Sequence, residues 1–303
     1  QDHLDYHGSM NEYFETKTRL FKQHYFKNDH VFPLVNIDNK WGNLLVKQLN
    51  GRCWRCSLDK DIIETHNVEL YITNIEMTSL GFKGHLYTPA GDGLFVSPLI
   101  GHFNLMNLLQ SVGVLIQQQL PLQNILKEIP NFPGVPGRME KISFKSCANS
   151  VNTPTVIVDY AHTPDALKNA LTGIRPFCLG KLVCVFGCGG DRDRSKRSKM
   201  GAIAAELADR IIVTSDNPRN EDPMRIINDI LNGIPTGVTC NVEVHRSEAI
   251  ELAISYTSSS DVVLLAGKGH EPYQIIGNQK KTFDDRKYAR NALRVKANKF
   301  ELS

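Results

Sequence analysis

Short apolar runs alternate with amphipathic segments throughout the second half of the chain. The apolar runs are residues 155–158, 182–186, 210–214 and 262–266. The amphipathic segments are residues 164–174, 199–207, 223–231 and 247–256. Strands of about five apolar residues that alternate with helices are typical of a parallel sheet covered by helices on both faces. We therefore predict a doubly wound α/β domain over residues 138–303.

The first half of the chain has a less regular pattern. Strand-like runs cover residues 31–37, 68–75, 84–87 and 93–96. The spacing of apolar residues predicts one helix that begins after Ser9 and a second helix over residues 104–119. Five Pro and Gly residues within positions 130–137 predict a linker. Residues 1–137 are therefore predicted to form part of another α/β domain with some antiparallel sheet.

Composition narrows the class of protein. With 41% hydrophobic and 22% charged residues, the chain has the composition of a globular protein and not of a disordered one. No apolar run approaches the roughly 20 residues that span a bilayer, so we expect no membrane insertion. A net charge of +3 is too small to indicate nucleic-acid binding without a basic patch. Seven irregularly spaced cysteines argue against a disulfide framework and favour a reduced, cytoplasmic protein.

Polar residues follow each of the four predicted parallel strands, at the end where ligands bind in open α/β sheets. They lie at residues 159–164, 187–193, 216–219 and 267–271. We expect these strand ends to converge on one polar-ligand site. The glycine-rich turn at 187–190 could bind an anion through its backbone N–H groups, but it is neither a Walker A loop nor a full dinucleotide fingerprint. A tight turn followed by a solvated basic stretch at 192–197 explains the pattern equally well.

Three side chains at these strand ends indicate the kind of ligand. Arg192 and Arg219 can each hold a carboxylate through two parallel hydrogen bonds, and Glu271 can pair with an ammonium group. This mixture suits a zwitterion such as an amino acid. The alternative is that Arg219 and Glu221 form surface ion pairs, which contribute little to stability.

A metal site near the start of the chain has weak support from the residues alone. His3, Asp5 and His7 alternate, so they would share one face of a strand, but a further His or Cys for zinc is not nearby. Lys17 falls on the polar side of the first predicted helix, where a lysine is usually solvated.

Two further pairs in the first half have simple structural interpretations. Cys53 and Cys56 have CxxC spacing without a second pair, which favours ordinary packing. Asn104 and Asn107 follow a Gly-His-Phe turn where a helix is predicted to start, which favours helix capping.

The motifs taken together resemble those of the Mur ligase family. They are DHLDYHG with Lys17 downstream, GHFNLMN, GRME, VDYAHTPDAL, FGCGGDRD, SDNPR and AGKGHE, in the order of the family and across essentially the whole chain. The resemblance is strongest to members that add diaminopimelate. It implies that residues 1–137 are the C-terminal part of the central ATP-binding domain. Residues 138–303 would be the C-terminal, Rossmann-like domain that binds the incoming amino acid.

The family's phosphate-binding loop and UDP-sugar domain lie upstream of DHLDYHG, and we find no such loop here. Together with the polar run at Gln1, this predicts an N-terminally truncated piece that is inactive alone. The resemblance implies an ATP-dependent ligase of peptidoglycan synthesis. It would add meso-2,6-diaminopimelate to UDP-N-acetylmuramoyl-L-alanyl-D-glutamate through an acyl phosphate, with magnesium, as a monomer. Alternatives are a lysine-adding Mur ligase, a folylpolyglutamate-type ligase and a non-catalytic Mur-like scaffold. The SDNPR and GKGHE matches disfavour the first two, and the retention of His3 and Lys17 disfavours the third.

The resemblance also implies roles for individual residues. His3 and Lys17 would be catalytic and would bind magnesium, Lys17 as a carbamate formed with carbon dioxide. The ATP-binding residues would be Asn104, Asn107, Arg138 and Asp159. The diaminopimelate-binding residues would be Arg192, Asp216, Asn217, Pro218, Arg219, Gly267 and Glu271. Arg219 would pair with the carboxylate that diaminopimelate has and lysine lacks, because an arginine without a partner penalises lysine.

Overall fold

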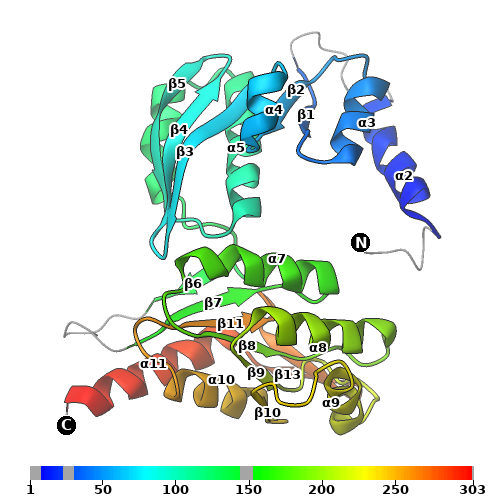
Figure 1. Ribbon diagram of the computed structural model, residues 1–303, viewed down its shortest axis with the longest axis vertical. Coiled ribbons are helices and arrows are strands. Elements are labelled where there is room, and N and C mark those ends of the chain that lie inside the picture. Colours follow the sequence, from blue (N-terminus) through cyan, green and yellow to red (C-terminus); the bar gives the residue numbers. More distant parts are fainter. Residues whose placement is uncertain (1–7, 23–30, 144–152, 302–303) are drawn as a thin grey trace. The chain divides into compact units, whose positions relative to one another are not determined.

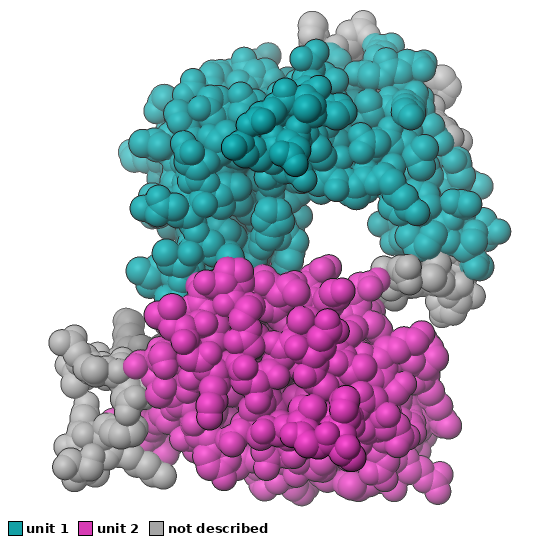
Figure 2. All heavy atoms as spheres, viewed as in Figure 1, with its two compact units in different colours: residues 1–133 teal, residues 134–303 magenta. Residues whose placement is uncertain are grey.

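The computed structural model of the chain describes residues 8–22, 31–143 and 153–301 (Figure 1). The chain divides into two compact units, residues 1–133 and residues 134–303, which Figure 2 colours separately. The division falls within the segment rich in Pro and Gly. Each unit has its own sheet and its own core, and we describe each by itself.

Unit 1 is built on a mixed sheet of five strands. The strands are β1 (Leu34–Asn36), β2 (Trp54–Ser57), β3 (Leu70–Thr78), β4 (Gly81–Thr88) and β5 (Gly91–Ser97), in that spatial order. The pairs β1–β2 and β2–β3 are parallel, whereas β3, β4 and β5 form an antiparallel meander. The expected combination of an α/β arrangement with some antiparallel sheet is therefore confirmed.

The helices of unit 1 differ in how much they bury. They are α2 (Met10–Lys22), α3 (Lys40–Gln48), α4 (Lys60–Thr65), α5 (His102–Gln117) and α6 (Leu122–Glu128), followed by a 3-10 turn at Ile129–Asn131. Helix α5 forms the core with the sheet, because Leu105, Leu109 and Val112 are almost completely buried against it. The sequence-based prediction omits helices α3 and α4, whose apolar residues Leu45, Val46 and Ile62 are only partly buried.

Unit 2 contains a sheet of six strands in the order β10-β9-β8-β11-β7-β6. The strands are β6 (Glu140–Ile142), β7 (Thr155–Asp159), β8 (Leu182–Phe186), β9 (Arg210–Val213), β10 (Cys240–Val242) and β11 (Val262–Ala266). All neighbours are parallel except the edge strand β6, which pairs antiparallel with β7. A separate antiparallel hairpin joins β12 (Tyr273–Ile276) to β13 (Gln279–Thr282).

Helices cover both faces of this sheet (Figure 1). They are α7 (Pro164–Ile174), α8 (Ser195–Leu207), α9 (Pro223–Leu231), α10 (Arg246–Ser255) and α11 (Asp285–Glu301), with a 3-10 turn at Arg175–Phe177. One core joins Val183, Val185 and Leu265 to residues of α10 and α11. Every residue of β8 and β11 is buried, as expected for strands covered on both sides. The predicted doubly wound arrangement is confirmed.

No helix within the described ranges combines the length and the apolar character that a bilayer crossing requires.

Candidate functional site

The carboxyl ends of the central strands of unit 2 meet in one place. The N–H of Gly267, just after β11, donates to the carbonyl of Asp159 at the end of β7 with a distance of 3.0 Å. A Cβ atom on Gly187, after β8, would lie 2.2 Å from the carbonyl oxygen of Thr214, after β9. A side chain at Gly187 would therefore separate the two loops, and glycine allows them to pack closely.

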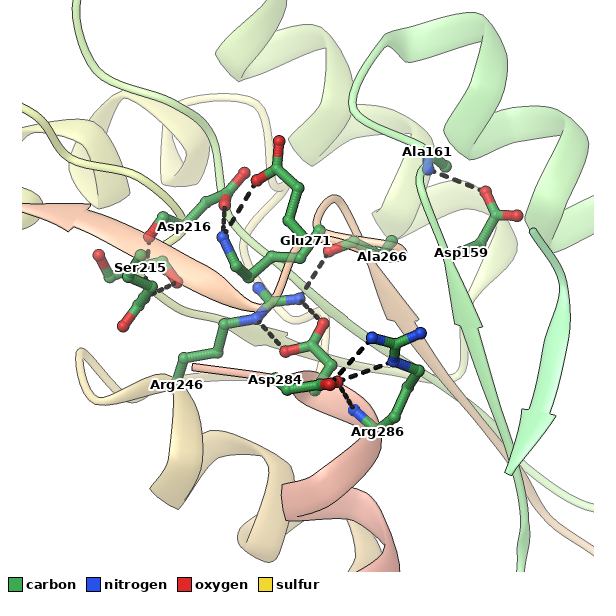
Figure 3. Close-up of polar contacts among 12 residues, drawn as sticks. Asp159, Ala161, Ser215, Asp216, Arg246, Ala266, Glu271, Asp284 and Arg286 are labelled. Carbon is green, nitrogen blue, oxygen red and sulfur yellow. Dashed lines mark hydrogen bonds and ion pairs between the residues drawn. The ribbon is translucent and has the colours of Figure 1, made fainter. Parts of the chain in front are cut away.

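The ammonium group of Lys268 is the centre of the polar cluster at these strand ends. The Lys268 side chain is completely buried, and its Nζ atom lies 3.2 Å from Oδ1 of Asp216 and 3.4 Å from Oε2 of Glu271. It also donates to Oδ1 of Asn217 at 3.1 Å. Figure 3 shows the carboxylates of Asp216 and Glu271 pointing toward the same nitrogen. Burial of a charge is tolerated here because opposite charges and hydrogen-bond acceptors surround it.

The β12–β13 hairpin fixes the segment that carries Asp216 and Arg219. The side chain of Gln274 donates to the carbonyl of Asp216 at 2.8 Å. The backbone N–H of Arg219 donates to Ile275 at 3.0 Å, and the N–H of Gly277 donates back to Arg219 at 2.7 Å. These bonds hold Arg219 at φ +51, in the left-handed region that a residue with a side chain rarely adopts.

Within the part of the chain that the structure describes, the Arg219 guanidinium donates to neutral backbone carbonyls. Its Nη1 atom donates to the carbonyl of Gly190 at 2.9 Å and to that of Asn217 at 3.4 Å. Among the described residues, no carboxylate forms an ion pair with Arg219. A Cβ on Gly189 would lie 2.9 Å from this Nη1 and 3.8 Å from Cγ of Arg192, so both arginines flank the same glycine. Arg192 is exposed and donates to the carbonyl of Asp191.

The remaining predicted pocket residues belong to the same cluster. Pro218 is buried, and its carbonyl oxygen would lie only 1.9 Å from a Cβ on Gly190. Gly267 has φ +111, and a Cβ there would lie 3.4 Å from Oδ2 of Asp216. The structure therefore brings together the seven residues expected to contact an amino acid.

The stretch at 192–197 is solvated only in part, which corrects one interpretation of the sequence. The Arg197 side chain is completely buried and forms ion pairs with Glu221 at 2.8 Å and with Asp229 at 2.9 Å.

Glu221 also accepts a hydrogen bond from the N–H of Asp191, which anchors the loop after β8. Glu221 is thus the partner of Arg197 and Arg194, and not of Arg219 as the surface-pair interpretation held. These arginine hydrogen bonds lower the pKa of Glu221 to about 2.

Arg246 and Asp285 form a second buried ion pair near the Lys268 cluster. Arg246, at the start of α10, donates to both carboxylate oxygens of Asp285 at 2.8 and 2.7 Å and to the carbonyl of Ala266. Both charged side chains are completely buried. Figure 3 shows Arg246 together with Asp216, and the Asp216 carboxylate interacts electrostatically with the Arg246 guanidinium. Sequence reasoning missed the roles of Arg197, Arg246 and Lys268, because the partners of the two arginines and two of the three partners of Lys268 lie in distant segments of the chain.

Asp159 and Arg138 lie together at the start of unit 2. The two oxygens of Asp159 accept hydrogen bonds at 2.8 Å from the backbone N–H groups of Met139 and Ala161. Burial raises the pKa of Asp159, although these N–H groups oppose the shift. The exposed guanidinium of Arg138 lies 4.6 Å from the centroid of the Tyr160 ring.

The two asparagines in unit 1 do not cap helix α5, which corrects the simple interpretation. The N-cap is Gly101 with φ +90, and no side chain caps the helix there. Asn104 is buried in the first turn and donates to the carbonyl of Ile100 at 2.8 Å. Asn107 is exposed one turn later.

The expected metal ligands are only partly within the described residues. His3, with Asp5 and His7, lies outside them. Lys17 is exposed on α2, with its ammonium 4.7 Å from the centroid of the Tyr13 ring. Within residues 8–22, 31–143 and 153–301, no three His, Cys, Asp or Glu side chains are grouped in a way that could hold a metal ion.

Cys53 and Cys56 are buried free thiols in and beside β2. Burial raises the pKa of Cys56 to about 12, so its thiol stays protonated and unreactive near neutral pH. This agrees with a packing role for the pair.

Comparisons with known proteins place both units in one family. The model described as "Mur ligase middle domain" matches residues 1–115, and the model described as "Mur ligase, glutamate ligase domain" matches residues 137–269. A UDP-N-acetylmuramoyl-L-alanyl-D-glutamate–2,6-diaminopimelate ligase of Prochlorococcus marinus (strain MIT 9313) is 56% identical over 294 residues, or 97% of this chain. A ligase of the same name from Trichormus variabilis (strain ATCC 29413 / PCC 7937) is 50% identical over 294 residues.

Solved structures lead to the same family. A structure of a UDP-N-acetylmuramoyl-L-alanyl-D-glutamate–2,6-diaminopimelate ligase shares 35% identity with a TM-score of 0.64, over 97% of this chain and 58% of that one. MurF ligase from Thermotoga maritima, in complex with ADP, has a TM-score of 0.64 at 12% identity over 99% of this chain and 60% of that one, which shows a shared fold. The chain spans 58% of the length of the Prochlorococcus relative and 57% of the Trichormus relative.

Proposed function

The chain belongs to the Mur ligase family, and from this premise we propose that it is part of an ATP-dependent ligase that adds meso-2,6-diaminopimelate to UDP-N-acetylmuramoyl-L-alanyl-D-glutamate in peptidoglycan synthesis. Residues 1–137 would belong to the ATP-binding domain, and residues 138–303 would form the domain that binds the amino acid. The names of relatives at 50–56% identity support this proposal.

The observation that carries the proposal is the half-buried Arg219 guanidinium, which lacks a carboxylate partner among the described residues and lies in the same segment as Asp216. A guanidinium beside carboxylates suits a ligand end that has both a carboxylate and an ammonium group. Each end of diaminopimelate has both. Lysine has an ammonium but no carboxylate at its far end, so it would leave Arg219 unpaired.

The proposed reaction has two steps. The terminal phosphoryl group of ATP is transferred to the D-glutamyl carboxylate, and ADP leaves. The deprotonated amine of diaminopimelate then attacks the acyl carbon, and inorganic phosphate leaves with the electrons of the C–O bond. The residues of unit 2 would hold the amino acid by its far end, so that its near amine is free to react.

Candidate ATP contacts come from both units. Asn104 and Asn107 on α5, together with Arg138 and Asp159, would contact the nucleotide. The two carboxylate oxygens of Asp159 each accept a hydrogen bond from a backbone N–H group. Each oxygen has a further lone pair that could accept a hydrogen bond from a ligand hydroxyl. The exposed guanidinium of Arg138 suits a phosphate.

Magnesium remains a proposal that rests on His3 and Lys17. The described residues do not form a magnesium site by themselves, because they provide no group of three possible ligands. An unmodified lysine ammonium cannot coordinate a cation, so Lys17 would first have to lose a proton. The lone pair of the neutral amine would then attack carbon dioxide, and loss of a second proton from nitrogen would give the carbamate. Magnesium would neutralise the charge that gathers where phosphates and a carboxylate meet.

Cytoplasmic location and a monomeric state are further parts of the proposal. The six cysteines whose side chains are described are free thiols, which suits a reducing compartment. All residues of the proposed amino-acid pocket come from one chain, so a second copy is not needed to complete it.

Isothermal titration of this chain with meso-diaminopimelate and, separately, with L-lysine tests the proposal. We expect diaminopimelate to bind at least about tenfold more tightly, because only its carboxylate pairs with Arg219. Equal affinity for the two amino acids would favour a lysine-adding enzyme, and no binding of diaminopimelate would contradict the proposed function.

A further inference from the structure

We propose that Lys268 is a positioning residue of the amino-acid pocket, which arranges Asp216, Asn217 and Glu271 to receive the ammonium group at the far end of the ligand. The inference rests on the proposed function, because it assumes that the pocket holds an amino acid. Lys268 is not among the residues that the family resemblance implies for diaminopimelate binding.

The contacts of Lys268 use its full capacity for hydrogen bonding. A lysine ammonium has three N–H donors and no acceptor. The Nζ atom of Lys268 is within 3.4 Å of one oxygen on each of three side chains, those of Asp216, Asn217 and Glu271. Because these three acceptors use all three donors, and because the side chain is completely buried, Lys268 has no donor left for a ligand. Its role is therefore to hold other groups and not to touch the amino acid.

Lys268 determines which end of the Asn217 amide faces Glu271. The Oδ1 atom of Asn217 accepts from Nζ of Lys268 and from the N–H of Ile275 at 3.0 Å. The Nδ2 atom donates to Oε2 of Glu271 at 3.1 Å. A rotated amide would direct its own N–H groups at the ammonium and at the N–H of Ile275, so donors would face donors. The amide orientation is thus fixed on two sides.

Lys268 also sets the charge available to a ligand. Asp216 and Glu271 contribute two negative charges, and the Lys268 ammonium balances one of them. The nearby Arg246 is balanced by Asp285. One net negative charge remains beside the Arg219 guanidinium, and this matches a single ligand ammonium next to a single ligand carboxylate. Without Lys268, two carboxylates and a free amide would face one another, and repulsion would separate them.

The test compares ligands that differ only in the far ammonium group. The probes are meso-diaminopimelate and L-2-aminopimelate, which keeps both carboxylates but lacks the second amine. Titration calorimetry is carried out on the wild-type chain, on Lys268→Met, on the neutral but hydrogen-bonding Lys268→Gln, and on Lys281→Met as a control for an exposed lysine on β13. Thermal unfolding of each variant records stability separately.

We expect Lys268→Met to weaken diaminopimelate binding by about tenfold or more, because the far ammonium of the ligand would lose a charged hydrogen-bond partner. Aminopimelate has no such ammonium, so its affinity should change by less than about twofold. Lys268→Gln should fall between Lys268→Met and wild type, and Lys281→Met should match wild type. Equal weakening of both ligands would mean a general structural role, and unchanged or tighter diaminopimelate binding would overturn the inference. If the wild-type chain bound no diaminopimelate, the proposed function itself would fail.

Discussion

Glu221 stabilises the loop after β8 from two sides. It pairs with the buried Arg197 and accepts the backbone N–H of Asp191, only one residue from Arg192. Both contacts are stronger with the ionised carboxylate than with the protonated carboxyl, so they lower the pKa of Glu221 from 4.5 to about 2. A group with a lowered pKa stabilises the folded state above the pKa of its unfolded form. This contribution decreases as the pH falls from about 4.5 toward 2.

We predict that Glu221→Gln lowers the stability of unit 2 at pH 7 by about 2 kcal/mol, through the loss of charged hydrogen bonds. The difference from wild type should shrink as the pH falls from 4.5 to 2, because the wild-type carboxylate becomes protonated. Urea denaturation at several pH values measures it, with Glu251→Gln, at an exposed position of α10, as the control. An identical pH dependence in Glu221→Gln and wild type would show that Glu221 makes no such contribution.

The candidate site could be predicted from the sequence where one strand end carries its own polar residues. Arg219 and Glu271 are predicted in this way, because they lie in the loops that follow β9 and β11. Arg197 was predicted to be solvated but is buried, because its partners Glu221 and Asp229 lie 24 and 32 positions further along the chain. A single sequence gives no signal for such distant pairing.

At the scale of elements, glycine is needed where unit 2 begins. Gly137 has φ +70, and a Cβ there would lie 2.1 Å from the backbone nitrogen of His270 and 2.3 Å from the carbonyl carbon of Gly269. The loop after β11, which includes Lys268, therefore packs directly against the segment that leads into β6. Nothing flexible is present in this contact to move aside.

We predict that Gly137→Ala destabilises unit 2 by about 1–3 kcal/mol more than Gly237→Ala. Both glycines have positive φ, so backbone strain is common to the two variants, but a Cβ at Gly237 has no atom within 4 Å. Guanidinium denaturation, followed by circular dichroism, measures the difference. Equal destabilisation would mean that the close approach to His270 relaxes without cost.

The central strands of unit 2 are predictable from the sequence, whereas the hairpin strand β13 and the start of helix α8 are not. The apolar runs at 182–186 and 262–266 coincide with β8 and β11, because burial on both faces leaves only hydrophobic residues there. Strand β13 is exposed along its whole length, so it has no apolar pattern to detect. Helix α8 begins four residues before its predicted start, since the polar turn from Ser195 is stabilised by tertiary contacts of Arg197.

At the scale of the whole molecule, the proposed amino-acid pocket lies within unit 2. Every side chain assigned to it comes from residues 134–303, whereas the proposed ATP contacts are divided between the units. Recognition of the amino acid can therefore be measured on this chain, even though the chain spans only 58% of the Prochlorococcus relative. That measurement tests which amino acid the proposed pocket binds. It does not test the family membership or the folds of the two units.

The measurement that tests the central claim most directly is a set of four titrations: wild type and Arg219→Ala, each with meso-diaminopimelate and with L-lysine. If Arg219 pairs with the far carboxylate of diaminopimelate, Arg219→Ala should weaken diaminopimelate binding by about tenfold or more and leave lysine affinity nearly unchanged. The two amino acids should then bind with similar affinity. A loss of the same factor for both ligands would contradict the account, because Arg219 would then support the pocket without recognising the carboxylate.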